Sequence, residues 1–224
     1  MHLLPPDLAS LPERYRANFV NSITGFKSLA LIGTADAEGQ TNLAIFSSVV
    51  HLGSNPPLVG IINRPATDTA RRHTLENILA TGFYTLNHVT PSIYTAAHQT
   101  SARYPADVSE FDATGLTPFY STGVAGLAAA RVPYVAQSSV RLGMQYVERH
   151  DISNGTVLIV GRIVEVFLPP DTDPAAPLVS PDGYINLEAA ATLCGSGVDS
   201  YHTTQRIERL AYAKTTEGSA KRLG

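Results

Sequence analysis

Hydrophobic residues in the first quarter of the chain follow the two spacings that distinguish helices from strands. Four of them are three or four positions apart, as on one face of a helix: Leu8, Leu11, Tyr15 and Phe19. Residues 28–34 and 41–50 are apolar stretches of strand length, and the polar residues 35–40 separate them. Gly39 can supply the positive φ of a tight turn there. The pattern predicts an amphipathic helix followed by a β-hairpin.

Further along the chain, strand-like stretches outnumber helical ones. Strands are predicted at residues 58–62, 83–89, 140–147 and 155–168. A short helix is predicted at residues 74–81, with Thr74 as its N-cap and Gly82 as its left-handed end. Residues 91–131 indicate loops and helices, and a last short helix is predicted around Ile207, Leu210 and Ala211. Many strands with few β-α-β alternations predict a mainly β protein, an antiparallel barrel with helices around it.

Composition limits the number of domains and the class of protein. The length of 224 residues suits a single domain over residues 1–224, with 1–22 as an N-terminal helical extension and 215–224 as a frayed tail. A net charge of −3 argues against a general nucleic-acid binder. The chain has neither an apolar stretch of membrane-spanning length nor a signal-peptide pattern. We therefore expect a cytoplasmic protein without nucleic-acid or membrane partners.

The motifs of several enzyme classes are missing from the sequence. It contains no G-x-S-x-G elbow, no P-loop and no G-x-G-x-x-G after a strand. Gly195-Ser-Gly197 is interpreted as a turn, and the single cysteine, Cys194, as an inert buried thiol. The histidines show no metal-ligand spacing, so no bound metal is expected: His2, His51, His73, His88, His98, His150 and His202.

Residues 42–48 mix small polar and apolar side chains within one predicted strand. If side chains alternate regularly, one face carries Leu43, Ile45 and Ser47. The other face then carries Asn42, Ala44, Phe46 and Ser48. Such a strand can offer flat apolar contact and hydrogen bonds to a planar heterocycle. The alternative is an ordinary barrel strand that tolerates serine at an edge.

Residues 63–74 concentrate cationic and hydroxyl side chains in an otherwise lightly charged chain. The segment holds three arginines, a histidine and three threonines, and it leads into the predicted helix at Thr74. A helix start offers free N–H groups and a positive dipole end, and arginine adds charge-assisted hydrogen bonds to phosphate oxygens. The segment predicts a phosphate site. The alternative is a solvated basic loop with Thr74 as a plain N-cap.

Taken in order, several short segments resemble the flavin reductase-like family of FMN-binding split-barrel proteins. The matching pieces span most of the chain: Ser28–Thr34, Gly39–Asn42, Phe46–Ser48, Asn55–Val59, Thr74-x-x-Asn77-Ile78, Thr81–Phe83, Asn87, Ser109–Phe111, Asn154–Thr156 and Asp199–Tyr201. The resemblance implies an FMN-binding split β-barrel with flanking helices. It also implies a homodimer that holds the flavin near the subunit interface.

The resemblance further implies which residues contact the flavin. The isoalloxazine ring would lie along the strand that carries Asn42, Ile45, Phe46, Ser47 and Ser48. The flavin phosphate would meet Arg64, Arg72, His73 and Thr74. Asn87 and His98 are further candidates, each with a structural role as the alternative. The chain departs from the family where it has Arg72-His73-Thr74 and Lys27-Ser28, since many members carry Lys-Asp-Thr and Arg-Pro there.

By this resemblance the chain is an FMN-binding oxidoreductase of the flavin reductase type. NAD(P)H would reduce the flavin, which passes electrons to a free flavin or another acceptor. Because the flavin performs the chemistry, no catalytic residue is assigned. One alternative is a non-enzymatic FMN-binding electron carrier or flavin-storage protein. Another is a split barrel for haem or pyridoxal phosphate, with His51, His88 or His98 as a haem ligand.

Overall fold

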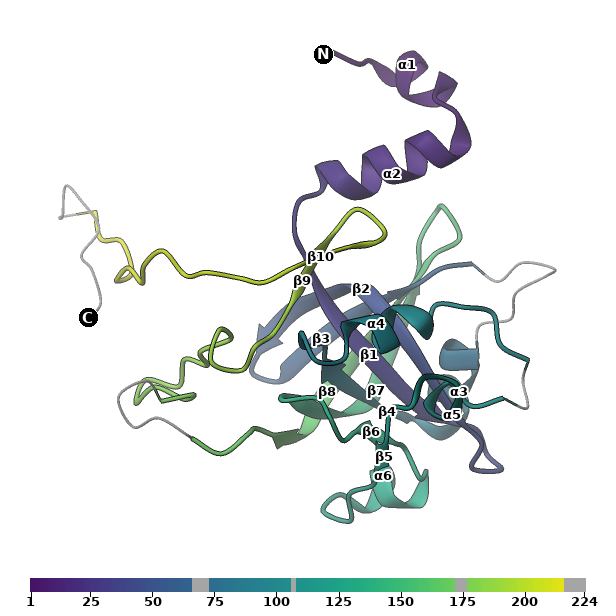
Figure 1. The fold of residues 1–224 in the computed structure, drawn as a ribbon, viewed down its shortest axis with the longest axis vertical. Coiled ribbons are helices and arrows are strands. Elements are labelled where there is room, and N and C mark those ends of the chain that lie inside the picture. Colours follow the sequence, from purple (N-terminus) through teal and green to yellow (C-terminus); the bar gives the residue numbers. More distant parts are fainter. Residues whose placement is uncertain (66–72, 106–107, 172–176, 216–224) are drawn as a thin grey trace.

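A closed barrel of six antiparallel strands forms the centre of the computed structural model, which describes residues 1–65, 73–105, 108–171 and 177–215 (Figure 1). Its strands are β1 (Lys27–Ala35), β2 (Thr41–Ser54), β3 (Pro57–Asn63), β4 (Phe83–His88), β7 (Arg141–Asp151) and β8 (Val157–Phe167). Within this described part, neighbours follow the order β1-β2-β3-β8-β7-β4, and β4 pairs with β1 to close the ring. The predicted mainly β barrel is confirmed.

Shorter elements surround the barrel. The hairpin of β9 (Cys194–Ser196) and β10 (Ser200–His202) extends the sheet beside the start of β1, and β5 (Pro118–Phe119) pairs with β6 (Tyr134–Val135) apart from it. The helices near the barrel are α3 (His73–Thr81), α4 (Tyr94–Gln99), α5 (Glu110–Thr114) and α6 (Ala125–Ala129). No helix in the described residues is long and apolar enough to cross a membrane.

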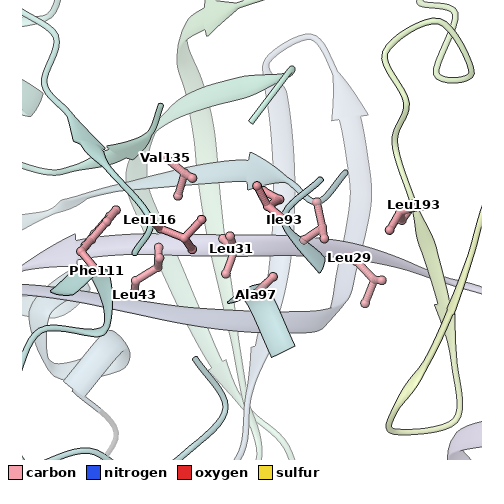
Figure 2. Packing of buried hydrophobic residues seen from close by; sticks show 10 residues of the cluster. Leu29, Leu31, Leu43, Ile93, Ala97, Phe111, Leu116, Val135 and Leu193 are labelled. Carbon is pink, nitrogen blue, oxygen red and sulfur yellow. The ribbon is translucent and has the colours of Figure 1, made fainter. Parts of the chain in front are cut away.

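β1 is buried on both faces because it separates two hydrophobic clusters. Ala30 and Ile32 face the barrel interior, with Val59, Ile61, Tyr84, Met144 and Ile159. Leu29 and Leu31 face outward, where α4 and α5 cover the sheet (Figure 2). Their neighbours in that outer cluster are Leu43, Ile93, Ala97, Phe111, Leu116, Val135 and Leu193. This double burial explains why residues 29–33 of the strand are an uninterrupted apolar run.

The predicted turns have the expected glycine conformations. Gly39 lies between β1 and β2 with a φ of 85°, and the Asp36 carboxylate accepts the N–H groups of Glu38 and Gln40. Gly82 ends α3 with a φ of 76°, and its N–H donates to the Ile78 carbonyl. Both positions use the left-handed region that glycine enters at little cost. Of the predicted turn at 195–197, Gly195 instead belongs to β9.

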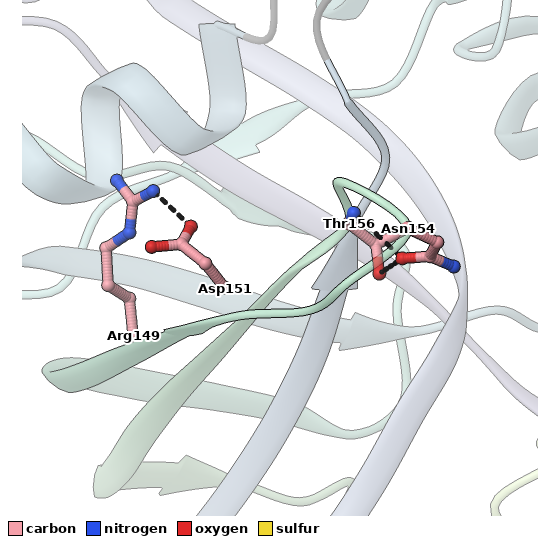
Figure 3. A network of polar contacts seen from close by, with 4 residues as sticks. All are labelled: Arg149, Asp151, Asn154 and Thr156. Carbon is pink, nitrogen blue, oxygen red and sulfur yellow. Dashed lines mark hydrogen bonds and ion pairs between the residues drawn. The ribbon is translucent and has the colours of Figure 1, made fainter.

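The turn between β7 and β8 is stabilised by short-range polar contacts (Figure 3). The Asn154 side-chain oxygen accepts hydrogen bonds from the Thr156 N–H at 3.0 Å and the Thr156 hydroxyl at 2.7 Å. Nearby, Arg149 forms an exposed ion pair with Asp151 at 2.5 Å. An asparagine that bonds to the backbone two residues on favours a tight turn. These contacts define where the two long strands reverse.

The regular alternation predicted for residues 42–48 is wrong beyond Phe46. Ala30 of β1 lies opposite Phe46, but Ser28 lies opposite Val49, so Ser47 and Ser48 of β2 stand opposite a single β1 residue. This is a β-bulge, which leaves one residue out of the hydrogen-bond ladder. As a result Phe46 and Val49, three positions apart, both pack against the barrel interior.

The two ends of the chain differ from the sequence-based expectation. In place of one N-terminal helix there are two, α1 (Pro5–Ser10) and α2 (Glu13–Ile23), because Pro12 begins a new helix as its N-cap. The helix predicted around Leu210 is absent, since residues 203–209 are irregular. Arg209 instead pairs with Asp182 at 2.5 Å and lies over the Tyr184 ring. Residues 216–224 lie outside the described residues.

His88 predicts a measurable pH dependence of stability. It ends β4 with Nδ1 3.0 Å from the Thr192 hydroxyl, and burial lowers its pKa to about 4. Below pH 6.5 the unfolded chain gains a proton that the folded chain excludes, so stability falls as the pH drops. We expect a loss of about 2 kcal/mol between pH 7.5 and 5 from this group.

Urea unfolding at pH 7.5 and pH 5 measures this contribution of His88 to the free energy of unfolding. The His88→Asn variant should lose stability between pH 7.5 and 5 by about 2 kcal/mol less than the parent protein does. His51→Asn, at an exposed position on β2, is the matched control and should behave like the parent. An unchanged pH dependence in His88→Asn would contradict the assignment.

Candidate functional site

A cleft with a volume of about 530 Å³ lies along β2, between the start of α3, the α4 region and the β9–β10 hairpin. Most of the site residues expected from the sequence line it: Asn42, Ile45, Phe46, Ser47, Ser48, Arg64, His73, Thr74 and His98. These residues come from three segments that are far apart in the sequence. The structure thus brings the predicted ring strand and the predicted phosphate segment into one cavity.

One end of the cleft is held together by a chain of polar side chains. The Asn42 amide donates to the Thr74 hydroxyl oxygen at 3.0 Å and to the Thr34 hydroxyl oxygen at 3.4 Å. Thr34 also accepts the Asn77 amide at 3.1 Å. These bonds join β1, β2 and α3. Because Thr74 accepts from Asn42, its own O–H is left to donate to a ligand.

Thr74 does not occupy the predicted N-cap position. The helix begins at His73, so Thr74 lies within its first turn, where it is buried. A buried threonine in a helical first turn, bonded to β2, has a packing role that the capping pattern did not indicate. The sequence-based assignment of Thr74 as the cap is therefore wrong, although its place at the helix start is correct.

Glu110 is a cleft residue that the sequence analysis did not single out. Its carboxylate accepts the Leu43 N–H at 2.9 Å, which fixes the start of β2 against α5. Burial raises the pKa of Glu110, while the hydrogen bond from Leu43 and the charge of His73 oppose that rise. The segment 109–111 belonged to the family resemblance, but it carried no indication of this contact.

The other end of the cleft carries Lys27 and Arg64. The Lys27 ammonium donates to the Gly197 carbonyl at 2.6 Å, and the pKa of Lys27 is lowered by burial and then by the positive charge of Arg64. Lys27 is seven positions before Thr34 along β1, a separation of about 23 Å between the two backbones. Arg64, expected beside Thr74, lines the same cleft and acts electrostatically on Lys27. Lys27 and Arg64 make this part of the cleft cationic.

An aromatic group borders the cleft near α4. The Tyr201 hydroxyl lies 2.8 Å from Nδ1 of His98, and the Tyr201 ring lies 5.5 Å from the ring of Tyr94. Burial raises the pKa of Tyr201, and the charge of Asp199 adds to the rise. The residues 199–201 matched the family pattern, yet a contact with His98 across 103 positions has no local sequence signal.

Asn63 supplies an unused hydrogen-bond donor. It lines the cleft at the end of β3, is only 3% exposed, and its side-chain nitrogen has no hydrogen-bond partner among the residues that the structure describes. Leaving such a donor buried and unpaired costs about 1–3 kcal/mol, so a ligand acceptor at this place is favourable. Apolar residues of β2, the unpaired donor of Asn63 and the cationic side chains of Lys27 and Arg64 together fit a ligand that has a polar ring and an anionic group, as a flavin nucleotide does.

One expected site residue, Asn87, does not line the cleft, and another lies outside the described residues. Asn87 lies in the sheet, where its amide donates to the Leu31 carbonyl and the Thr85 hydroxyl and its oxygen accepts the Val135 N–H. All of its bonds are therefore structural. Arg72 lies outside the described residues.

The candidate haem and metal ligands are dispersed. Among the described residues, no group of three or more His, Cys, Asp or Glu side chains is arranged to hold a metal ion. His51 is exposed on β2 and His88 is bonded to Thr192, so of the haem candidates only His98 lines the cleft. Cys194, expected to be buried, is half-buried on β9, and burial raises its pKa.

Residues 24–186 match the family model described as the flavin reductase like domain. The chain belongs to this family. It is similar to a solved structure from Shewanella frigidimarina named for a flavin reductase with a split barrel domain, with 47% identity, a TM-score of 0.85, and coverage of 95% of this chain and 100% of that one. The family and this fold make the protein a flavin-related oxidoreductase with a flavin cofactor.

A more distant solved structure agrees on the fold, and a sequence relative matches part of the chain. An FMN-binding protein from Thermus thermophilus is 17% identical, with a TM-score of 0.59 and coverage of 80% of this chain and 86% of that one. An uncharacterized protein from Aquifex aeolicus is 27% identical over 92 residues, which are 41% of this chain and 47% of that protein. The flavin reductase-like chain thus has the split barrel predicted from its sequence.

Proposed function

We propose that the protein is an FMN-dependent oxidoreductase of the flavin reductase type, which takes hydride from NAD(P)H and delivers electrons to a flavin or another acceptor. The observation that carries this proposal is the cleft itself, which brings β2, the start of α3 and the cationic side chains of Lys27 and Arg64 into one cavity. When bound, FMN supplies the hydride chemistry at its ring, and the protein supplies binding, orientation and electrostatics. The absence of a catalytic motif in the sequence agrees with this division.

The start of α3 is proposed to hold the FMN phosphate. His73 and Thr74 line the cleft there, and the first turn of a nine-residue helix directs unpaired N–H groups and a positive dipole end toward an anion. Thr74 adds a hydroxyl donor, because Asn42 occupies its acceptor side. Arg72, next to His73 in the sequence, is proposed to add a charge-assisted bond.

The middle of β2 is proposed to hold the isoalloxazine ring. Ile45 and Phe46 offer apolar contact, and the bulge at Ser47 and Ser48 interrupts the backbone ladder, so that a backbone polar group is available to the ring. The unpaired amide of Asn63 is a further donor to a ring carbonyl. Asn42 is proposed to connect the part of the cleft that holds the ring with the part that holds the phosphate, because its amide is bonded to Thr74.

Lys27 and Arg64 are proposed to stabilise negative charge at the far end of the cleft. Their two positive charges lie close enough for Arg64 to lower the pKa of Lys27, a repulsion that an anionic group between them would remove. His98, fixed by Tyr201, borders the same cavity. We also propose a homodimer as the working unit, acting in the cytoplasm where reduced nicotinamide nucleotides are present.

An absorption spectrum of the purified protein, before and after reconstitution with FMN, tests the cofactor assignment. We expect the two visible bands of an oxidised flavin and retention of FMN after removal of the free cofactor. A haem-like spectrum would favour the alternative in which His98 binds iron. A colourless protein that retains no FMN would contradict the proposal. An FMN-loaded protein that no nicotinamide reduces would favour the electron carrier or storage protein instead.

A further inference from the structure

The N-terminal residues 1–26 form an arm that contacts little of its own chain. Figure 1 shows α1 and α2 projecting from the barrel at the point where β1 begins. Neither helix has a buried residue. Instead, the arm exposes large apolar side chains, of which six are more than two-fifths exposed: Met1, Leu4, Tyr15, Val20, Ile23 and Phe26.

Helices of this length need tertiary contacts. α1 has 6 residues and α2 has 11, whereas isolated helices below about 12–15 residues are marginal in water. On α2 the apolar residues Tyr15, Phe19 and Ile23 recur at four-residue spacing, and the Tyr15 and Phe19 rings stack at 6.1 Å. A helix with an apolar stripe is stabilised when that stripe is covered. The arm therefore requires a partner surface.

The accessible surface area of the chain also indicates that apolar surface is left uncovered. Its accessible area is 13284 Å², whereas a compact monomer of 23.9 kDa is expected to expose about 9,900 Å². The excess is about 3,400 Å² for one chain, whereas obligate homodimers bury about 1,000–2,500 Å² on each partner, or about 2,000–5,000 Å² in total, so a dimer interface accounts for part of the excess. Because the arm lacks buried residues, it accounts for part of this excess.

The barrel carries an uncovered apolar surface that can receive the arm. Val50, Leu52 and Leu158 converge over Gly60 on the outside of β2, β3 and β8, since a Cβ added at Gly60 would lie 2.8–3.3 Å from atoms of all three side chains. Val50 and Leu52 are 45% and 44% exposed. We call these three residues the β2–β3–β8 patch.

We propose that residues 1–26 are an intersubunit arm, which packs its apolar side on the β2–β3–β8 patch of a second copy of this chain. The inference rests on the homodimer of the proposed function and adds which surfaces form it. Ser28 pairs with Val49, so each arm leaves the barrel beside the end of β2 that carries the patch. A two-fold axis near this end places each arm over the other copy's patch and covers both surfaces.

A second copy explains both uncovered surfaces with one partner. The chain contains an apolar arm and an apolar patch side by side, and neither covers the other within one copy. In a two-fold dimer the same pair of surfaces meets twice, once for each chain. A different protein would have to match two separate surfaces at once.

Cysteine cross-linking locates the arm on the partner. In a Cys194→Ser background, the double variant Ile23→Cys/Leu52→Cys should give a covalent dimer with a short bismaleimide. The single variants should stay monomeric on a denaturing gel, as should Ala17→Cys/Leu52→Cys, whose helix position lies on the other side of α2. A cross-link within one chain, or between two Ile23→Cys single variants, would overturn the proposal.

Light scattering on charge variants gives a second test that separates this inference from the dimer itself. Ile23→Glu and Leu52→Glu should each weaken the dimer at least tenfold, whereas Ala17→Glu and Val166→Glu, exposed positions outside the contact, should not. A monomeric parent protein would contradict the proposed homodimer. A dimer that is indifferent to Ile23→Glu and Leu52→Glu would contradict the arm and leave the dimer in place.

Discussion

Replacing Thr74 with valine should lower the affinity for FMN by about ten- to a hundredfold, while riboflavin, which lacks the phosphate, is bound nearly as before. The Thr74 hydroxyl lies at the start of α3 and is left to donate because Asn42 occupies its acceptor side. Valine has the same shape and cannot donate. Arg72→Ala should act in the same direction, since its charge would meet the same phosphate. Titration by flavin fluorescence measures both ligands.

Thr81→Val is the matched control for this prediction. Thr81 ends the same helix, where its hydroxyl donates to the Asn77 carbonyl, and it does not line the cleft. The control should bind FMN and riboflavin like the parent protein. An equal loss of both ligands in Thr74→Val would show that Thr74 shapes the ring pocket, and the phosphate assignment would be wrong.

Gly33→Ala should destabilise the protein by about 3 kcal/mol, which corresponds to a fall in Tm of about 6–12 °C for a chain of this size. A Cβ at Gly33 would lie 2.2 Å from the Pro133 carbonyl oxygen and 2.6 Å from the Thr85 hydroxyl. The Thr85 hydroxyl donates to the Pro133 carbonyl in a buried hydrogen bond of 2.6 Å, and the Thr85 oxygen accepts the Asn87 amide at 2.9 Å. The added methyl group must therefore displace backbone in a fully buried network.

Gly53→Ala provides the comparison for the glycine prediction. Its added Cβ would meet only the Pro56 carbonyl, at 3.5 Å, and its φ is not positive. Thermal unfolding of this variant should stay within about 0.5 kcal/mol of the parent. A Gly33→Ala variant as stable as Gly53→Ala would show that the β1–β4 contact is looser than described.

The barrel strands were predictable because a buried strand appears in the sequence as a run of consecutive apolar residues. The central residues 29–33 of β1 are apolar because both faces of the strand are covered, and the glycines at 39 and 82 occupy positions that require positive φ. Such signals are local, so the pattern of residues alone indicates them. The order of matching segments then indicated the split barrel.

Features that depend on distant contacts were not predictable. The bulge at Ser47 and Ser48 arises from the pairing with β1, and the C-terminal segment follows its contacts with Asp182 and Tyr184 instead of its helical spacing. In the site, Lys27 stood out only as a departure from the family. Glu110 reaches the cleft through a hydrogen bond across 67 positions, which no local pattern predicts.

The proposed function depends on hydride transfer to a bound flavin, and anaerobic reduction measures this step directly. The FMN-loaded protein, freed of excess cofactor, is mixed with NADH or NADPH while the visible absorbance of the flavin is followed. Dithionite serves as the control that the bound flavin can be reduced. We predict rapid bleaching by at least one of the two nicotinamides. Bleaching by dithionite with none by either nicotinamide would contradict the reductase and favour the electron carrier.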